Sequence, residues 1–175
     1  KLLTIGRLVD QKDHNTLLRS INLLKNEKIQ LLIIGNGSNK DKLERYIFEK
    51  NLISKVKIIP FQNNPHKYLK IADIFLFTSK FEGLPNVLLE AQTLKKYIIS
   101  TKCPTGPNEI LLNGKAGDLI KIGDYKKMAE KIKYYINNKK KLKNKIIFGY
   151  KNLNRFDYNY NMKQYSKIIS KFIYF

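Results

Sequence analysis

The sequence predicts an α/β protein built on an open, doubly wound parallel sheet. Short apolar runs alternate with longer segments in which apolar residues recur every three or four positions. The run at residues 29–34 is apolar at nearly every position, as expected where helices cover both faces of a parallel sheet. With 175 residues, of which 43% are hydrophobic, the chain is long enough to bury its own core.

Five apolar runs are predicted as strands, at residues 2–5, 29–34, 56–59, 74–79 and 97–100. Helical patterns follow them: about 13 residues after the first strand, a helix after Ser38, a short helix ending at Ile71, one from Pro85 to about Leu94, one from Tyr125 to about Asn137, one from about Lys140, and a last one at 158–175. Ser38 and Asp41 have the spacing of a capping box.

The chain is strongly basic, with a net charge of +20 that comes from 30 Lys and 4 Arg. Residues 121–175 carry +12 of this charge. A basic final third suits an anionic membrane surface or a nucleic acid, and a solvated lysine surface is the plainer alternative. No recognised nucleic-acid-binding signature accompanies the charge, so we expect no nucleic-acid partner.

Other features narrow the class of protein. The single cysteine, Cys103, excludes an internal disulfide and a Cys-based metal site, and two histidines make a His-rich zinc site unexpected. No apolar run approaches the roughly 18 residues of a membrane span, and no leader pattern opens the chain, which predicts a cytoplasmic setting. Because the chain starts at Lys1 inside a predicted strand, we expect further sequence upstream.

The unusual residues gather in loops that follow strands. Ligands of doubly wound sheets bind beyond the carboxyl ends of the strands. Four loops are predicted to leave those ends, at residues 6–13, 35–38, 79–85 and 101–109. The first of them carries Arg7 and Lys12. An arginine guanidinium is able to donate two parallel hydrogen bonds to phosphate oxygens. Spacing alone leaves a diphosphate site and a pair of surface charges equally open.

The segment FEGLPNVLLE, residues 81–90, predicts an anion site at a helix start. Pro85 suits the first turn of a helix, and the N–H groups of Asn86, Val87 and Leu88 would then point out of the helix end, where phosphate binds well. Gly83 would let the backbone approach a ligand closely.

Two carboxylates flank this helix start. Glu82 precedes it, and Glu90 lies eight positions further on, which places their backbones roughly 10–12 Å apart. That separation fits the roughly 5 Å pair of a retaining glycosidase poorly. It suits two contacts on an elongated ligand with a phosphate bridge, against the plainer alternative of two unrelated surface acids.

Four segments together carry a resemblance to a known family. GRLVDQKD, IIGNGSNKDKLE, FTSKFEGLPNVLLEAQ and CPTGPNEIL occur in the order and near the spacing of retaining, nucleotide-sugar-dependent glycosyltransferases of family 4. Over essentially its whole length the chain resembles the carboxyl-terminal, donor-binding, Rossmann-like half of their GT-B fold, in enzymes that build bacterial surface polysaccharides. Asp13 stands where these enzymes often have glycine, and we expect it to cap a helix.

The resemblance implies a role for each matching residue. Arg7 and Lys12 would hold the donor diphosphate and assist its departure, Glu82 would contact the transferred sugar, and Glu90 would bind the ribose. Phe61 is a candidate for the base. The loop and helix start that would face the phosphates and the sugar comprise Gly83, Leu84, Pro85, Asn86, Val87 and Leu88. The family uses no metal or other cofactor, and a UDP- or GDP-sugar is the expected donor.

The resemblance also implies a division of the chain. Residues 1–157 would form the donor-binding domain, and the helix at 158–175 would cross to an amino-terminal acceptor domain, exposing Tyr165, Ile168, Ile169, Phe172 and Phe175. The expected reaction moves a hexose or N-acetylhexosamine, with retention, to a lipid-linked or cell-surface glycan, at the cytoplasmic face of a membrane. The alternatives are an inactive nucleotide-binding remnant and a basic nucleic-acid-binding module. His66 is expected to be a surface or packing residue.

Overall fold

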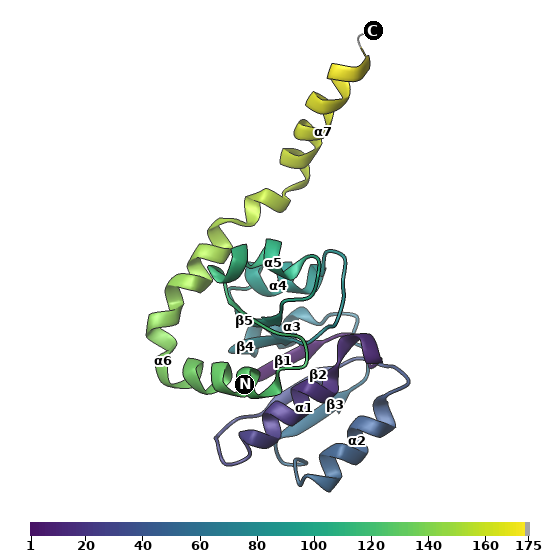
Figure 1. Ribbon diagram of the computed structural model, residues 1–175, viewed down its shortest axis with the longest axis vertical. Coiled ribbons are helices and arrows are strands. Elements are labelled where there is room, and N and C mark those ends of the chain that lie inside the picture. Colours follow the sequence, from purple (N-terminus) through teal and green to yellow (C-terminus); the bar gives the residue numbers. More distant parts are fainter. Residues whose placement is uncertain (174–175) are drawn as a thin grey trace.

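A computed structural model describes residues 1–173 and has a six-stranded parallel sheet in the order β3-β2-β1-β4-β5-β6 (Figure 1). This order is that of a doubly wound, Rossmann-like sheet, so the predicted fold class is confirmed. The strands are β1 (Leu2–Ile5), β2 (Leu31–Ile34), β3 (Val56–Ile59), β4 (Ile74–Phe77), β5 (Tyr97–Thr101) and β6 (Asp118–Ile120).

Five of the six strands lie where the apolar runs predicted them. Predicted strand two begins at Leu31 rather than residue 29, and strand four ends at Phe77 rather than residue 79. The sixth strand, β6, was missed, so the expectation of five strands was wrong. Its three residues begin with a charged Asp118, which is too short and too polar a run to be recognised without its partner β5.

Helices cover both faces of the sheet. The helices on one face are α1 (His14–Leu23), α2 (Lys40–Glu49) and α6 (Tyr125–Lys151). The helices on the other face are α3 (His66–Ile71), α4 (Asn86–Thr93) and α5 (Pro107–Ile110). Helix α7 (Tyr158–Ile173) extends away from the sheet (Figure 1). Successive side chains alternate between the two cores: Leu2 and Leu76 pack with α1 and α6, whereas Leu3 and Phe77 pack with α3 and α4.

The chain reverses its direction of winding between β1 and β4. From β1 it continues to β2 on one side, and from β4 to β5 on the other, so the loops after β1 and β4 separate at the carboxyl edge. The ladder between these two strands pairs only Leu2 with Ile74 and Leu3 with Phe75, whereas β1 pairs with β2 at four positions. We refer to the place where the loops after β1 and β4 diverge as the crevice; ligands of such folds bind at this point.

Helix α6 is held to the sheet edge by a buried polar cluster around Asp118. Lys145 donates to one carboxylate oxygen at 2.6 Å and Tyr97 to the other at 2.8 Å. Burial alone would raise the pKa of Asp118, but these hydrogen bonds and the charges of Lys145 and Lys131 lower it below its ordinary value. The two predicted helices in this region are the halves of α6, which are joined at a non-helical Asn138.

Of the two predicted helix caps, one is confirmed and the other is wrong. Asp13 is the N-cap of α1, with its carboxylate accepting from the Thr16 N–H, so the expected cap is confirmed. Its φ of +47° lies in the left-handed region, which asparagine and aspartate tolerate better than most residues. The predicted capping box is wrong: α2 starts after Asn39, and no side chain caps it.

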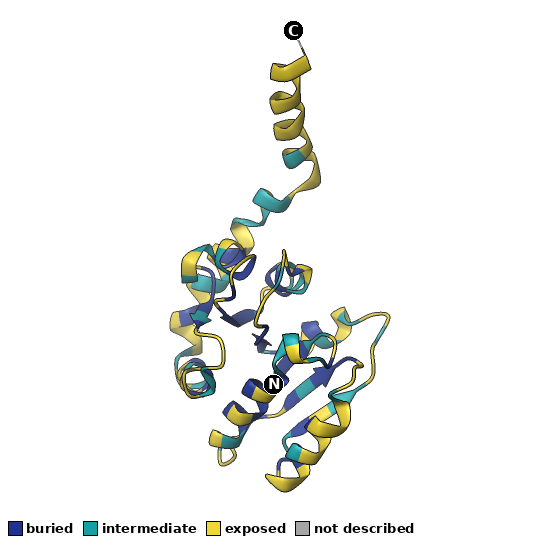
Figure 2. Ribbon diagram, turned by 45° about the vertical axis from the view of Figure 1, so that its right-hand side comes forward, coloured by how far each residue is buried: buried dark blue, intermediate teal, exposed yellow. Residues whose placement is uncertain are grey.

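Helix α7 packs on almost nothing within the described residues. All of its side chains are exposed except the half-buried Asn161, as the colouring of Figure 2 shows. Tyr165, Ile168, Ile169 and Phe172 are among the exposed apolar residues, and Phe175 lies outside the described part. Across residues 1–173, no helix combines the length and the apolar character that crossing a bilayer requires.

Removing residues 158–175 should leave the melting temperature within roughly 3 °C of that of the whole chain, because α7 buries so little surface. Solubility should rise, since an exposed apolar patch is lost. A truncation after Asn138 is the contrasting control, because it also removes the buried Leu142 and the Asp118 partner Lys145. Thermal unfolding followed by circular dichroism decides; a large loss of stability in the first variant would mean that α7 belongs to the core.

Candidate donor-binding site

The loops after β1 and β4 meet in the crevice at the carboxyl edge. The Thr78 hydroxyl donates to the Lys12 carbonyl at 2.8 Å, and the Lys80 N–H donates to the Gln11 carbonyl at 2.8 Å. The Gln11 amide also donates to the Phe81 carbonyl at 2.9 Å. These bonds fix the backbone of the first loop along the start of the second, so that residues about 70 positions apart in the sequence share one site.

Lys12 and Glu82 form an ion pair across this contact. Lys12 Nζ lies 2.5 Å from Glu82 Oε1, and the two side chains are only 18% and 12% exposed. Lys12 ends the 3₁₀ turn Asp10–Lys12, and its ammonium lies 5.5 Å from the centre of the Phe77 ring. The structure thus brings together two of the residues that the sequence singled out.

Arg7 lies in the same loop and is exposed to solvent. Within residues 1–173 its guanidinium makes no hydrogen bond or ion pair, so all of its donors remain open to a ligand. The neighbouring loop after β2 runs close beside it: a side chain on Gly35 would collide with the Gly6 carbonyl, and one on Gly37 with the Leu8 carbonyl. These two glycines therefore serve the packing of loops, not a dinucleotide fingerprint.

The start of α4, which follows the loop of Glu82, differs in two details from the prediction. Pro85 is the N-cap and Asn86 the first helical residue. The Leu88 N–H donates to the Pro85 carbonyl at 2.9 Å, so it is not open to a ligand as expected. A tight first turn explains this bond, and it leaves the N–H groups of Asn86 and Val87 at the helix end. A side chain on Gly83 would meet open space.

The loop after β5 supports the loop that carries Glu82. The Thr105 hydroxyl donates to the Glu82 carbonyl. Gly106 has a φ of +82°, and a side chain there would collide with the Gly83 carbonyl and the Pro85 ring. The segment CPTGP thus supports Glu82 and the start of α4. This role could not be read from the sequence, because the two segments are far apart in the chain.

Glu90 lies on the outer side of α4, beside His66 at the start of α3. His66 Nε2 is 3.4 Å from Glu90 Oε2, in a groove of about 720 Å³ between α3 and α4. The His66 side chain is 54% exposed, so of the two expected roles it is a surface residue, and it lies beside Glu90. One signal existed: α3 precedes β4 and α4 follows it, which makes the two helices neighbours on one face of the sheet.

Phe61 follows β3 and is exposed at the same edge of the sheet. Its N–H donates to the side-chain oxygen of Asn36, in the loop after β2, at 3.4 Å. An exposed ring whose backbone is fixed by a hydrogen bond is able to stack against a planar ligand group, as the expected contact with a base requires.

His14, the first residue of α1, is almost fully buried directly after Asp13. Burial and the nearby charge of Lys12 lower the pKa of this imidazole from 6.5 to about 4. His14 therefore stays neutral at physiological pH, and Lys12 carries the positive charge of this part of the crevice.

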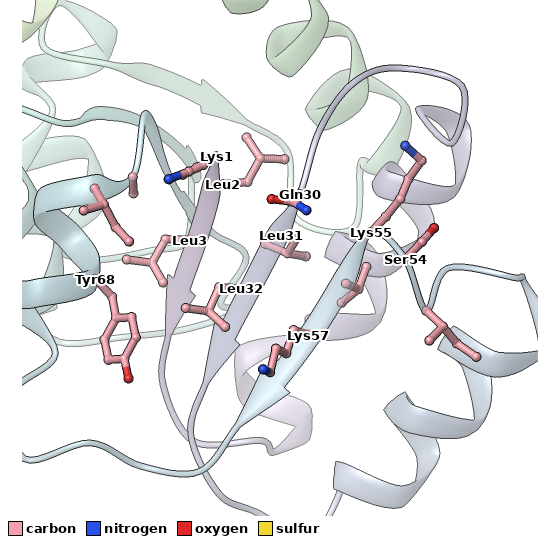
Figure 3. Close-up of a pocket in the computed structure, with 14 residues that line it drawn as sticks. Lys1, Leu2, Leu3, Gln30, Leu31, Leu32, Ser54, Lys55, Lys57 and Tyr68 are labelled. Atoms are coloured by element: carbon pink, nitrogen blue, oxygen red, sulfur yellow. The ribbon is translucent and has the colours of Figure 1, made fainter.

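No cluster of three or more His, Cys, Asp or Glu side chains that could hold a metal ion occurs in the part of the chain that the structure describes. A groove of about 360 Å³ has walls from the starts of β1, β2 and β3 and from α3, as Figure 3 shows. It lies at the amino ends of the strands, opposite to the crevice.

Arg7, Lys12, Glu82 and the start of α4 thus gather at one edge of a doubly wound sheet, with Glu90 on the outer side of α4, and this arrangement suits an elongated, anionic ligand. The chain belongs to the family described as glycosyl transferases group 1, which it matches over residues 1–152. Solved structures described as a glycosyltransferase and an O-GlcNAc transferase share its fold, in agreement with the resemblance drawn from the four sequence segments.

Curated relatives of the chain are longer proteins. An uncharacterized glycosyltransferase of Methanocaldococcus jannaschii is 43% identical over 111 residues, which cover 62% of this chain and 27% of that protein. A Campylobacter jejuni N-acetylgalactosaminyltransferase that acts on a diphospho-undecaprenol-linked saccharide is 34% identical over 139 residues, covering 79% of this chain and 38% of that protein. The chain therefore spans about a third of the relatives that it matches.

Solved structures agree on the fold. TarM of S. aureus, in a complex that contains UDP, superposes with a TM-score of 0.81 at 26% identity, over 89% of this chain and 32% of that one. Anabaena HepE in complex with UDP superposes with a TM-score of 0.88 at 20% identity, over 97% of this chain and 48% of that one.

Gly106→Ala should lower the free energy of unfolding by roughly 2–3 kcal/mol, because it combines a strained φ with a collision against the Gly83–Pro85 loop. Gly123→Ala is the matched control: its φ is +77°, but a side chain there would meet nothing within 4 Å. The control should cost only about 1 kcal/mol. Urea denaturation measures both, and equal losses would show that the contact between the two loops is unimportant.

Proposed function

We propose that this chain is the nucleotide-sugar-binding part of a retaining glycosyltransferase that moves a hexose or N-acetylhexosamine to a lipid-linked or cell-surface glycan. The observation that carries the proposal is the ion pair between Lys12 and Glu82, which joins the loop that also carries Arg7 to the loop that leads into α4. Membership of the glycosyl transferases group 1 family supports it, as do relatives named for capsule and lipopolysaccharide synthesis.

The proposed donor lies along the carboxyl edge of the sheet. Its diphosphate faces Arg7, Lys12 and the N–H groups of Asn86 and Val87, the ribose reaches Glu90, and the base lies against Phe61. UDP is the favoured nucleotide, because UDP is bound in the TarM and HepE structures that resemble this chain. The transferred sugar lies against Glu82 and the loop Gly83–Pro85.

Transfer breaks the bond between the sugar and the diphosphate, so negative charge grows on the leaving group. Arg7, Lys12 and the start of α4 would stabilise that charge, and electrostatic stabilisation of this kind contributes most to many enzymatic rates. A metal ion is not required for that role, and we propose that none is used. The acceptor and its binding residues belong to a preceding domain, to which α7 would cross.

The basic final third supports a location at the cytoplasmic face of a membrane. Most of the lysines of α6 are exposed, and residues 121–175 carry a net charge of +12. Each lysine near an anionic surface contributes on the order of 1 kcal/mol to binding. The nucleic-acid alternative has less support, because the candidate anion site lies at strand ends and not along a basic stripe.

A nucleoside diphosphate should bind the chain in the presence of EDTA. Titration calorimetry with UDP, GDP and ADP tests this, with UDP expected to bind most tightly. Binding that appears only after magnesium is added would contradict the metal-free site.

Glu90→Gln should weaken UDP binding by about 1–2 kcal/mol, because a charged hydrogen bond to the ribose is lost. Glu130→Gln, an exposed residue of α6, is the control for the change in charge.

Vesicles that contain phosphatidylglycerol should sediment the chain at low salt, whereas vesicles of phosphatidylcholine alone should not. The bound fraction should fall steeply as the salt concentration rises, because screening weakens attraction between exposed lysines and the surface. Equal binding to both kinds of vesicle, or none to either, would count against a peripheral membrane location.

A further inference from the structure

Lys12 and Glu82 depend on each other for their charge partner. In the described part of the chain, the Glu82 carboxylate makes its hydrogen bond and ion pair with Lys12 alone, at 2.5 Å, and Lys12 makes them with Glu82 alone. Both side chains are largely withdrawn from water, at 18% and 12% exposure. Water is therefore a poor substitute partner for either charge.

The backbones on both sides of the pair are held in place. The Lys12 carbonyl accepts from Thr78, and the Glu82 carbonyl accepts from Thr105. Gln11 ties the two loops together through the Phe81 carbonyl. Neither loop is able to withdraw its charged side chain without breaking these bonds, so any conflict between the pair and a ligand must be settled by the side chains themselves.

A bare nucleoside diphosphate creates such a conflict. If its phosphates take the Lys12 ammonium, the Glu82 carboxylate is left largely buried, without a cation, and beside new negative charge. Removing one partner of a buried ion pair is strongly unfavourable, and like charges at short range add to the cost. The diphosphate must therefore compete with Glu82 for Lys12.

An intact donor removes the conflict, because it brings a replacement partner. A hydroxyl of the transferred sugar is able to donate to the Glu82 carboxylate while the diphosphate takes Lys12. Both side chains then have a partner, and the two halves of the donor support each other's binding.

We propose that Glu82 makes the site select the intact nucleotide-sugar over the nucleoside diphosphate product, through its ion pair with Lys12. When the sugar has been transferred, Glu82 loses its hydroxyl partner and pairs with Lys12 again, which favours release of the diphosphate. This assigns Glu82 a role in product discrimination in addition to its contact with the sugar, and it rests on the proposed function.

The test compares UDP with UDP-glucose, UDP-galactose, UDP-N-acetylglucosamine and UDP-N-acetylgalactosamine, by calorimetry on the full chain. Glu82→Gln should tighten UDP binding about tenfold, because the competing carboxylate is gone. The tightest-binding UDP-sugar should gain no affinity, so the preference for donor over product should fall by about the same factor. Thermal unfolding checks that each variant is folded.

Two controls separate the ion pair from general charge effects. Glu130→Gln removes an equal charge on exposed α6 and should change the UDP dissociation constant less than twofold. In a Lys12→Gln background, Glu82→Gln should tighten UDP binding clearly less than in the wild-type chain, because only the direct repulsion between the carboxylate and the diphosphate is relieved and no cation is released. A gain of full size in this background overturns the role of the pair.

The outcomes distinguish this proposal from the proposed function. If the wild-type chain binds UDP and Glu82→Gln binds it equally or more weakly, product discrimination by Glu82 is wrong while the nucleotide site stands. If the wild-type chain binds neither UDP nor any of the four UDP-sugars, the proposed function and this inference fall together.

Discussion

The short ladder between β1 and β4 is the constraint on which the site depends. These neighbouring strands pair at only two positions, Leu2 with Ile74 and Leu3 with Phe75, and the chain leaves them in opposite directions. Backbone groups beyond Leu3 need other partners. Loop contacts supply some of them, such as the bond from Thr78 to the Lys12 carbonyl, and those contacts bring a cation and a carboxylate together.

The two faces of the sheet contribute differently to function. On one face, α1, α2 and α6 build the larger core, and the Asp118 cluster holds α6 to the sheet edge. On the other, α3, α4 and α5 carry residues of the site at or near their starts: His66, Asn86 and the preceding Gly106.

The charges of the crevice balance each other in a way that fits binding and release. Arg7 stays open to solvent, whereas Lys12 is held by Glu82 and His14 is kept neutral by burial. On our proposal, a ligand would meet one open cation and one that Glu82 releases only in exchange. Such an arrangement would favour a ligand that satisfies both sides of the pair over one that satisfies only the cation.

Much of the fold follows from the sequence alone. Parallel strands covered on both faces are nearly continuously apolar, so the strands from β1 to β5 were recognisable, and Asp13 was a readable cap because capping is local. The candidate site residues were found for a similar reason: glycine, proline and charged residues stand out in loops after apolar runs. Their roles came from the resemblance.

Only the tertiary structure decided which of these residues meet. The pairing of Lys12 with Glu82, the approach of His66 to Glu90 and the support of Gly106 join segments that are far apart in the chain. Strand β6 exists because β5 offers it a partner, and the Leu88 N–H is bonded because the first turn of α4 is tight. Local patterns determine which elements form, but the order of strands in the sheet determines which loops become neighbours, and no single segment contains that order.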